Sequence, residues 1–286
     1  MSLLFDRGPG MSDEEFRLMR DLVNRFCGIA FGEDAKYVVE RRLRERLQAL
    51  GLADFGEYYR HLRFHVDGDA ELERAVDLLT TNETYFFRES YQLHAFEREL
   101  LPEIAERNAA RKRLTIWSAG CSTGEEVYTI AMILASMPRF AGWDVRIFGS
   151  DISRRVLQQA RKGVYREASF RAMPPEHLRF FEETSEGRSV RSEIRAMCHF
   201  GHLNLLEHGR TAIVGAVDVI FCRNVLIYFD AESRARVVRT FFDRLVPGGY
   251  LLLGHSESLL RTTTDFELVH LRTDMVYRRP ATPEAR

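Results

Sequence analysis

Cysteine is scarce in this sequence, and no two cysteines stand in a C-x-x-C spacing. Their wide separation excludes a disulfide framework and a zinc–thiolate site, so we expect buried free thiols and no metal site. The cysteines are Cys27, Cys121, Cys198 and Cys222.

Long apolar runs and a cationic start are absent as well. No stretch of about 18 apolar residues exists, so neither a membrane-spanning helix nor direct membrane insertion is expected. The opening MSLLFDRGPG lacks the positive charge followed by an apolar stretch that a secretory signal needs. These absences predict a cytoplasmic protein.

Neither sign of charge is in excess. Lys plus Arg number 41 and Asp plus Glu 42, a net charge of -1, so no overall basic field is available to hold nucleic acid. With 45% apolar residues and only 8 prolines, the composition is that of a folded globular protein. A nucleic-acid partner is not expected, and any charged partner must meet a local patch.

The 286 residues suffice for one large or two modest domains, and the pattern changes near residue 82. Before it, apolar residues recur at helical spacing after Ser12. That helix face comprises Phe16, Met19, Leu22, Val23 and Phe26. Further helices are expected at about 34–50, 53–65 and 69–80. Residues 1–81 are therefore predicted to form a small all-helical domain.

After residue 88, short apolar strands alternate with helices. The strands are expected at 114–120, 144–151, 217–224 and 250–254, and the helices at about 89–109, 125–136, 153–162 and 231–245. This alternation predicts a doubly wound α/β domain over 91–286, after a linker at 82–90. An inserted β-hairpin is expected within about 165–200, at the polar turn Glu186-Gly187. A closing hairpin around Thr273 and Asp274 is expected at the sheet edge.

Chemistry is expected where parallel strands end, first in the loop AGCSTGEE at 119–126. A dinucleotide fingerprint needs glycine where Ser122 and Glu125 stand, and acids at a helix start repel a diphosphate. A serine hydrolase is a rival, because the loop matches G-x-S-x-G and Asp218 and His255 follow in triad order. However, no strand is predicted before residue 114 to supply the rest of an oxyanion hole.

A third candidate ligand is a nucleoside cofactor that carries a positive charge and no phosphate, as S-adenosylmethionine does. Glu126 provides an acid for the cation, and Asp151, at the end of the second strand, can accept both ribose hydroxyls. The alternative role for Asp151 is a helix N-cap, a position that Ser153 can take instead. Amides and a basic residue at 200–206 and 222–229 suit an adenine edge and a carboxylate.

Several motifs in register resemble the CheR family of chemotaxis-receptor glutamate methyltransferases. They are NETYFFR at 82–88, SAGCSTGEE at 118–126, GSDI at 149–152, NLL at 204–206, FCRNVLIYF at 221–229 and GHSE at 254–257. The resemblance covers nearly the whole chain, including the helical domain and the inserted hairpin. It implies methyl transfer from S-adenosylmethionine to glutamate side chains of membrane chemoreceptors, which forms glutamate 5-O-methyl esters in chemotaxis adaptation.

By matching position, the resemblance also implies the site residues. Arg88 and Tyr228 would lie beside the methyl group and orient the acceptor carboxylate, which is ionised near neutral pH and needs no general base. The cofactor contacts would be Asn82, Thr84, Arg88, Glu126, Asp151, Asn204, Leu205, Arg223 and Asn224. Taken alone, Arg88 would be interpreted as a surface arginine and Tyr228 as a core aromatic.

A basic stretch in the second predicted helix is the candidate receptor surface. Five cations against Glu40 and Glu45 give a local excess of 5 − 2 = 3 positive charges. The cations are Lys36, Arg41, Arg42, Arg44 and Arg46. The alternative is a solvated helix face with i,i+4 ion pairs.

The inserted hairpin bears on how a receptor would be held. Its tip at 184–188 lacks the R-G-x-G of family members that dock on a receptor's C-terminal pentapeptide, so a pentapeptide-independent type is expected. Two other functions stay open: a cofactor-binding regulatory module that signals through the helical domain, and an O-methyltransferase that acts on a different protein. Intact Arg88 and Tyr228 favour the receptor enzyme.

Overall fold

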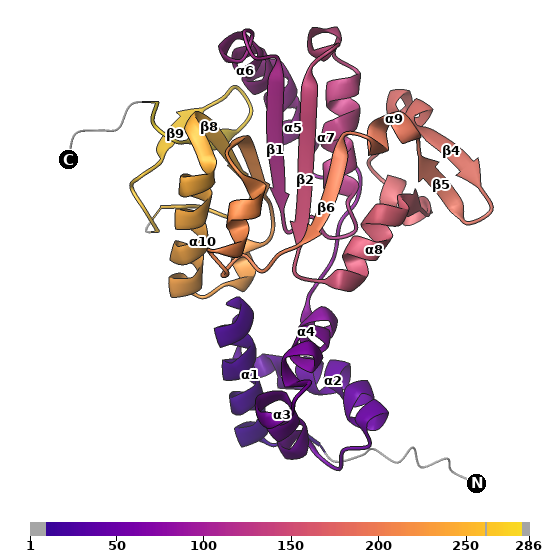
Figure 1. The fold of residues 1–286 in the computed structure, drawn as a ribbon, viewed down its shortest axis with the longest axis vertical. Helices are drawn as coiled ribbons and strands as arrows, with labels where there is room; N and C mark the ends of the chain where they lie inside the picture. The colour runs from indigo at the N-terminus through magenta and orange to yellow at the C-terminus, as the bar shows by residue number, and fades with distance from the viewer. Residues whose placement is uncertain (1–9, 261, 282–286) are drawn as a thin grey trace. The chain divides into compact units, whose positions relative to one another are not determined.

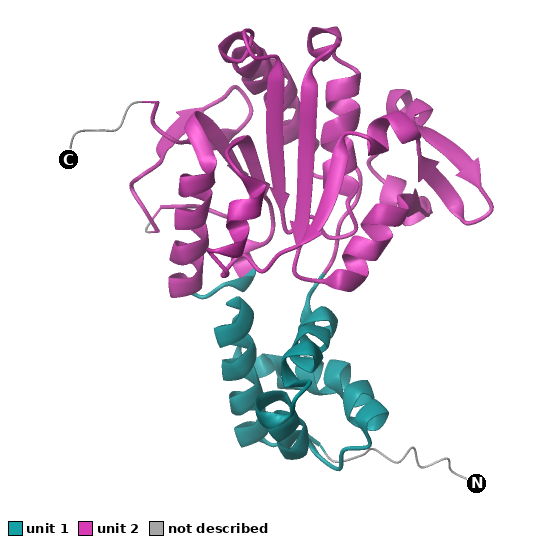
Figure 2. Ribbon diagram, viewed as in Figure 1, with its two compact units in different colours: residues 1–81, 228–230 teal, residues 82–227, 231–286 magenta. Residues whose placement is uncertain are grey.

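The computed structural model describes residues 10–260 and 262–281 and divides into two compact units (Figures 1 and 2). The first unit comprises the residues up to Thr81 together with Tyr228–Asp230, and the second comprises 82–227 and the residues from Ala231 onward. Among the described residues, no helix combines the length and the apolar character needed to cross a membrane.

The first unit is all-helical, as the apolar spacing predicts. Its helices are α1 (Asp13–Cys27), α2 (Lys36–Leu50), α3 (Phe55–Phe64) and α4 (Gly68–Leu79), with a 3-10 turn at Glu33–Ala35. Ser12 begins α1 through a reciprocal capping box with Glu15. The predicted face of α1 packs inward, with Met19 and Val23 fully buried. The expected helix face is confirmed for Phe16, Met19, Leu22 and Val23, whereas Phe26 is half-buried.

A buried carboxylate ties α2 to α4. Two nitrogens of Arg46 donate to the two oxygens of Glu71, each at 2.8 Å, and Tyr58 and Arg74 donate to the same carboxylate. Burial alone would raise the pKa of Glu71, but the hydrogen bonds from Arg46, Arg74 and Tyr58 lower it overall. Arg46 is therefore a structural partner of a fully buried acid.

Arg42 is also committed to the fold, because its Nη1 donates to the carbonyls of Leu79 and Thr80 at the end of α4. Arg42 and Arg46 are therefore bonded within the helical unit, and the receptor surface of five cations stays a prediction. Sequence spacing could not reveal these bonds, since the acceptors lie 25 to 38 residues away. Of the other three, Lys36 and Arg44 pair with Asp13 and Glu40, and Arg41 is exposed.

The second unit contains a seven-stranded sheet in the order β6-β2-β1-β7-β8-β10-β9. Its strands are β1 (Arg113–Ala119), β2 (Asp144–Asp151), β6 (Cys198–His202), β7 (Val217–Cys222), β8 (Leu245–Leu253), β9 (Glu267–His270) and β10 (Met275–Arg278). The first five in the sheet order are parallel, and β10 is antiparallel to β8 and β9. The strand order changes direction between β1 and β7. This topological switch point is where open parallel sheets bind ligands.

Helices cover both faces of this sheet (Figure 1). They are α5 (Ser90–Ala95), α6 (Leu101–Arg107), α7 (Glu125–Ala135), α8 (Arg154–Lys162) and α10 (Ala231–Arg244). The expected helix at 89–109 is realised as α5, a π-helical turn at Phe96–Leu100 and α6. The doubly wound α/β architecture is confirmed, and the hairpin of β9 and β10 closes the sheet edge as expected.

A small antiparallel sheet lies beside the main one. It has the order β3-β5-β4, from β3 (Val164–Tyr165), β4 (Phe181–Thr184) and β5 (Gly187–Val190), and short helical turns including α9 (Ser192–Arg195) flank it. The inserted hairpin is thus present, but its expected end at residue 200 is wrong. Residues 198–202 form β6, parallel to β2. Because β6 is an edge strand with only Cys198 buried, it lacks the apolar run that marks an inner strand.

Candidate functional site

The loop after β1 is shaped by close packing. Gly120 has φ +79°, and a Cβ there would stand 2.4 Å from Cγ2 of Val225. The amides of Gly120 and Cys121 both donate to the carbonyl of Ser150. This glycine therefore lets the first strand's loop lie directly against the segment that follows β7.

Asp151 supports that loop at the end of β2. Its Oδ2 accepts from the amide of Ser122 at 2.8 Å, and its Oδ1 accepts from the amide of Ser153 at 2.9 Å. The N-cap of α8 is Ser153, whose hydroxyl accepts from the amide of Val156. The alternative interpretation of Asp151 as the helix cap is excluded, and its carboxylate faces the glycine loop.

Arg223 lies at the centre of an acid-rich cluster beyond β7. Its Nη1 donates to Glu126 at 3.2 Å, and its Nη2 donates to Glu89 at 3.1 Å and to the carbonyl of Arg88 at 2.5 Å. Burial raises the pKa of Glu126, and the opposing effects of Arg223 and Ser118 do not cancel this rise. Two carboxylates facing one guanidinium leave an excess of negative charge at this edge of the sheet.

The segment 82–89 carries strained backbone next to this cluster. Phe87 and Glu89 have φ of 58° and 54°, which few side chains other than glycine adopt. Phe86 is fully buried against Phe170 and holds the segment. Arg88 donates from Nη1 to the carbonyl of Glu83. Arg88 therefore stands on a fixed loop before α5.

Two further predicted residues follow the edge strand β6. Asn204 is buried, and its Oδ1 accepts from the amide of Leu206, which closes a short turn. Leu205, within that turn, is buried too. Asn82 contributes its carbonyl to the hydroxyl of Ser122, while Thr84 is half-buried. Hydrogen bonds thus join Asp151 and Asn82 to Ser122. Asn204 and Leu205 follow Leu203, whose amide donates to the carbonyl of Asp151.

Glu257 is a site residue to which the sequence analysis assigned no role. Its carboxylate accepts from the amides of Asn224, Val225, Ile227 and Gly254 at 2.7 to 3.3 Å. The signal was present in the motif GHSE, because an acid following glycine at a strand end can bind backbone amides. Glu89 was missed as well.

Tyr228 belongs to the first unit, with Phe229 and Asp230. The amide of Ala30 donates to its carbonyl at 2.8 Å, and Ile29 forms a β-bridge with Phe229. The side chain of Tyr228 is about one third exposed, with 36% of its surface accessible. It is therefore not the core aromatic that the sequence alone favoured.

The hydrolase alternative fails on geometry. Asp218 accepts from Asn108, Arg111 and the amide of Thr115, near the amino end of β1 and opposite the glycine loop. A triad with Ser122 therefore cannot form. Burial also raises the pKa of Cys121 and Cys222, which leaves both thiols protonated and unreactive near neutral pH.

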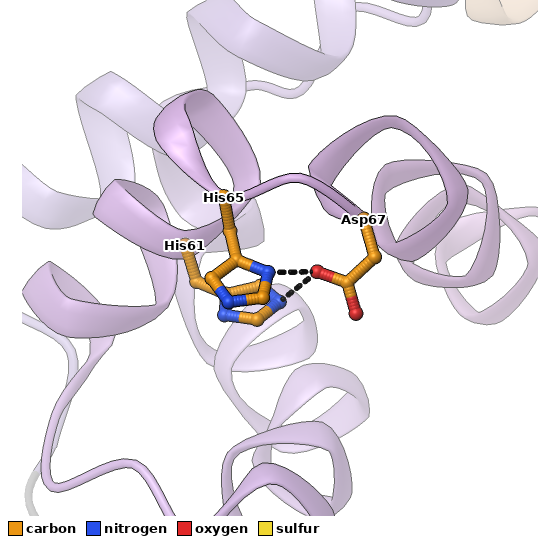
Figure 3. Close-up of side chains that lie close together, drawn as sticks. All are labelled: His61, His65 and Asp67. Carbon is orange, nitrogen blue, oxygen red and sulfur yellow. Dashed lines mark hydrogen bonds and ion pairs between the residues drawn. The ribbon is translucent and has the colours of Figure 1, made fainter.

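Among the described residues, one group of side chains is close enough to hold a metal ion, namely His61, His65 and Asp67 (Figure 3). Both imidazoles point at one oxygen of Asp67. The rings stack 4.3 Å apart and 14° from parallel, so an ion in the plane of one ring would lie outside the plane of the other. The hydrogen bond from His65 lowers the pKa of Asp67, so the carboxylate is the acceptor for both imidazoles.

Two buried polar atoms fit a bound cofactor. Nε of Arg223 and Oδ1 of Asn224 have no hydrogen-bond partner among the residues that the structure describes, although buried polar groups are nearly always paired. The donor Nε of Arg223 and the acceptor Oδ1 of Asn224 thus belong to neighbouring residues, beside the acid-rich cluster of Glu89 and Glu126. This combination fits the carboxylate and ammonium of an amino acid attached to a nucleoside, as S-adenosylmethionine carries.

Family comparisons agree with such a cofactor. The model described as "CheR methyltransferase, SAM binding domain" matches residues 82–275, and "CheR methyltransferase, all-alpha domain" matches 14–80. The chain belongs to the CheR family of S-adenosylmethionine-dependent methyltransferases. It is 37% identical over 273 residues to "Chemotaxis protein methyltransferase 2" of Vibrio cholerae, which covers 94% of each chain. It is also 37% identical over 263 residues to "Chemotaxis protein methyltransferase" of Escherichia coli, covering 90% of this chain and 89% of that one.

Proposed function

We propose that this protein transfers a methyl group from S-adenosylmethionine to glutamate side chains of chemoreceptors, forming glutamate 5-O-methyl esters. The acid-rich cluster carries the proposal, since Glu89 and Glu126 outnumber the single guanidinium of Arg223. Excess negative charge suits a ligand that carries a sulfonium. The relatives named chemotaxis protein methyltransferases support the choice of chemoreceptors as substrates.

Within this proposal, the residues at the strand ends hold the nucleoside. Asp151 accepts hydrogen bonds from the ribose hydroxyls, and Asn204 and Leu205 contact the adenine. Asn82 and Thr84 contribute from the linker, which begins the second unit. Their support is that Asp151 and Asn82 bond to Ser122 of the glycine loop, and that the amide of Leu203, next to Asn204, donates to the carbonyl of Asp151.

The amino-acid end of the cofactor faces the segment after β7. Nε of Arg223 donates to its carboxylate, and Oδ1 of Asn224 accepts from its amino group, because both atoms are buried without a partner in the described part of the chain. Glu126 adds negative charge near the sulfonium. Burial raises the pKa of Glu126, and a further cation beside its carboxylate would favour the ionised form.

S-adenosylmethionine supplies an activated methyl group when it is bound. Arg88 orients the acceptor carboxylate, and Tyr228 donates a hydrogen bond to the oxygen that does not attack. With the acceptor oriented in this way, no side chain of this protein would need to take up or release a proton during the transfer. Because the acceptor is ionised near neutral pH, positioning rather than acid–base chemistry dominates.

We assign receptor contact to α2, through Lys36, Arg41 and Arg44. Arg41 is exposed, and the ion pair of Lys36 with Asp13 lies at the surface, where such pairs contribute little and can exchange partners. Arg44 is half-buried and pairs with Glu40. An acidic receptor helix would be attracted to this face of the cytoplasmic enzyme.

Receptor recognition in this proposal does not need a C-terminal pentapeptide. The β4–β5 tip is short, and its side chains are occupied by the ion pairs Lys162–Glu186 and Arg188–Glu183. Because the tip at 184–188 also lacks the R-G-x-G sequence, docking on the body of the receptor rather than on its tail is proposed.

Incubation of the purified protein with S-adenosylmethionine and a receptor cytoplasmic fragment tests the proposal. Peptide mass spectrometry is expected to locate methyl esters on glutamates, with little product from Arg88→Ala. Methylation of a residue other than glutamate would contradict the assigned acceptor. Binding of cofactor without any product would favour a regulatory module.

A further inference from the structure

The loop between β7 and α10 is held by a single side chain from another loop. The carboxylate of Glu257 accepts from the amides of Asn224 at 2.7 Å, Val225 at 2.9 Å and Ile227 at 3.3 Å. It also accepts from Gly254, at the end of β8, at 2.7 Å. One side chain therefore fixes three amides of one loop and one amide of the strand beside it.

The loop conformation requires such support. Asn224 has φ of 59°, in the left-handed region, and its amide lies beyond the last ladder position of β7. A buried backbone donor without an acceptor is costly. Gly254 keeps the space open, since a Cβ there would stand 2.8 Å from both the Asn224 amide and the Glu257 carboxylate.

We propose that Glu257 is a positioning residue for methyl transfer, which holds the Asn224–Tyr228 loop in its working conformation. It acts through Asn224 on the cofactor and through Tyr228 on the acceptor carboxylate. The inference rests on the proposed function of those two residues. The chain from Ile227, whose amide Glu257 binds, continues directly into Tyr228.

Charge and shape both make glutamate specific at this position. Oε2 accepts from Asn224 and Gly254, and Oε1 accepts from Val225 and Ile227. A glutamine would present an NH2 group to one of these pairs of N–H donors, and donors cannot bond to one another. Glu257→Gln therefore disrupts two bonds while it preserves the volume of the side chain.

The test measures kcat for receptor methylation and affinity for S-adenosylhomocysteine. Glu257→Gln is expected to lower kcat by about tenfold or more, because hydrogen bonds to charged groups stabilise by roughly 1.5 to 3 kcal/mol. Glu232→Gln, the same chemical change at an exposed position in α10, is the matched control and should leave kcat unchanged. Equal behaviour of the two variants overturns the proposal.

A double-mutant cycle separates positioning from general stability. In a Tyr228→Phe background, Glu257→Gln should lower kcat by less than about twofold, since the two changes disable the same element. Independent, multiplicative losses overturn the proposal. If Glu257→Gln fails to fold, as thermal unfolding would show, Glu257→Asp replaces it under the same criteria.

A second double-mutant cycle, between Glu257 and Asn224, tests the positioning role even if the proposed role of Tyr228 fails. If Tyr228→Phe has full kcat, the role of Tyr228 in the proposed function fails, and the affinity for S-adenosylhomocysteine decides the inference. In that case, the losses of S-adenosylhomocysteine affinity caused by Glu257→Gln and by Asn224→Ala should be non-additive in the double variant. Additive losses of affinity overturn the positioning role.

Discussion

Removal of Arg46 should destabilise the helical unit strongly. Arg46→Ala takes both guanidinium bonds from Glu71, whose side chain is 0% exposed, and leaves it with Tyr58 and with Arg74, which is 57% exposed. Breaking one partner of a buried ion pair costs about 3 to 5 kcal/mol. Because two donors remain, we expect the lower end, about 3 kcal/mol, which is roughly a hundredfold or more in the folding equilibrium.

Urea unfolding of the full chain, followed by far-ultraviolet circular dichroism, measures this loss. Arg41→Ala is the matched control, because Arg41 is exposed on the same helix, and it should change the free energy of unfolding by less than about 0.5 kcal/mol. A loss below about 1 kcal/mol for Arg46→Ala, or similar losses for both variants, would refute the structural role of this arginine. The expected result also means that charge reversal at Arg46 cannot probe receptor docking.

Four further outcomes are expected. Asp151→Ala should weaken S-adenosylhomocysteine binding about 10- to 150-fold by calorimetry, since the ribose loses a charged acceptor; unchanged affinity in a folded variant would remove the ribose assignment. Arg88→Ala should lower kcat beyond any loss of cofactor affinity, and a preserved kcat at saturation would restrict Arg88 to binding. Because burial raises the pKa of Glu126, its carboxylate protonates earlier than usual as pH falls, so cofactor affinity should decline towards acid pH and the decline should vanish in Glu126→Gln. Receptors truncated at their C-terminus should be methylated at nearly the full rate, and a strong effect of truncation would place docking elsewhere. Arg41→Glu should slow methylation at low salt, and this slowing should shrink as salt rises, because exposed charges are screened over about 10 Å at 0.1 M.

Local signals were sufficient to predict most elements of the fold. Ser12 and Glu15 form the capping box that begins α1, and the apolar spacing of that helix gives its buried face. The inner strands β1 and β7 are predicted because both are short, largely apolar runs. β6 was assigned to the insert because an edge strand of mixed polarity carries no such signal.

The parts of the site that escaped prediction depend on long-range contacts. Position at a strand end identified Asp151, but the support that Glu257 gives to the segment after β7 joins residues 30 to 33 apart in sequence. The commitment of Arg42 and Arg46 to the fold likewise depends on acceptors in α4. Spacing within one element cannot reveal a partner that only tertiary packing brings near.

The central claim is methyl transfer to receptor glutamates, and one labelling measurement tests it most directly. Membranes that bear chemoreceptors are incubated with the protein and S-adenosylmethionine tritiated in the methyl group, and the receptor band is then treated with base. The account predicts labelled receptor whose label is released by base, as a carboxyl methyl ester requires. Base-stable label, or cofactor binding with an unlabelled receptor, would contradict it.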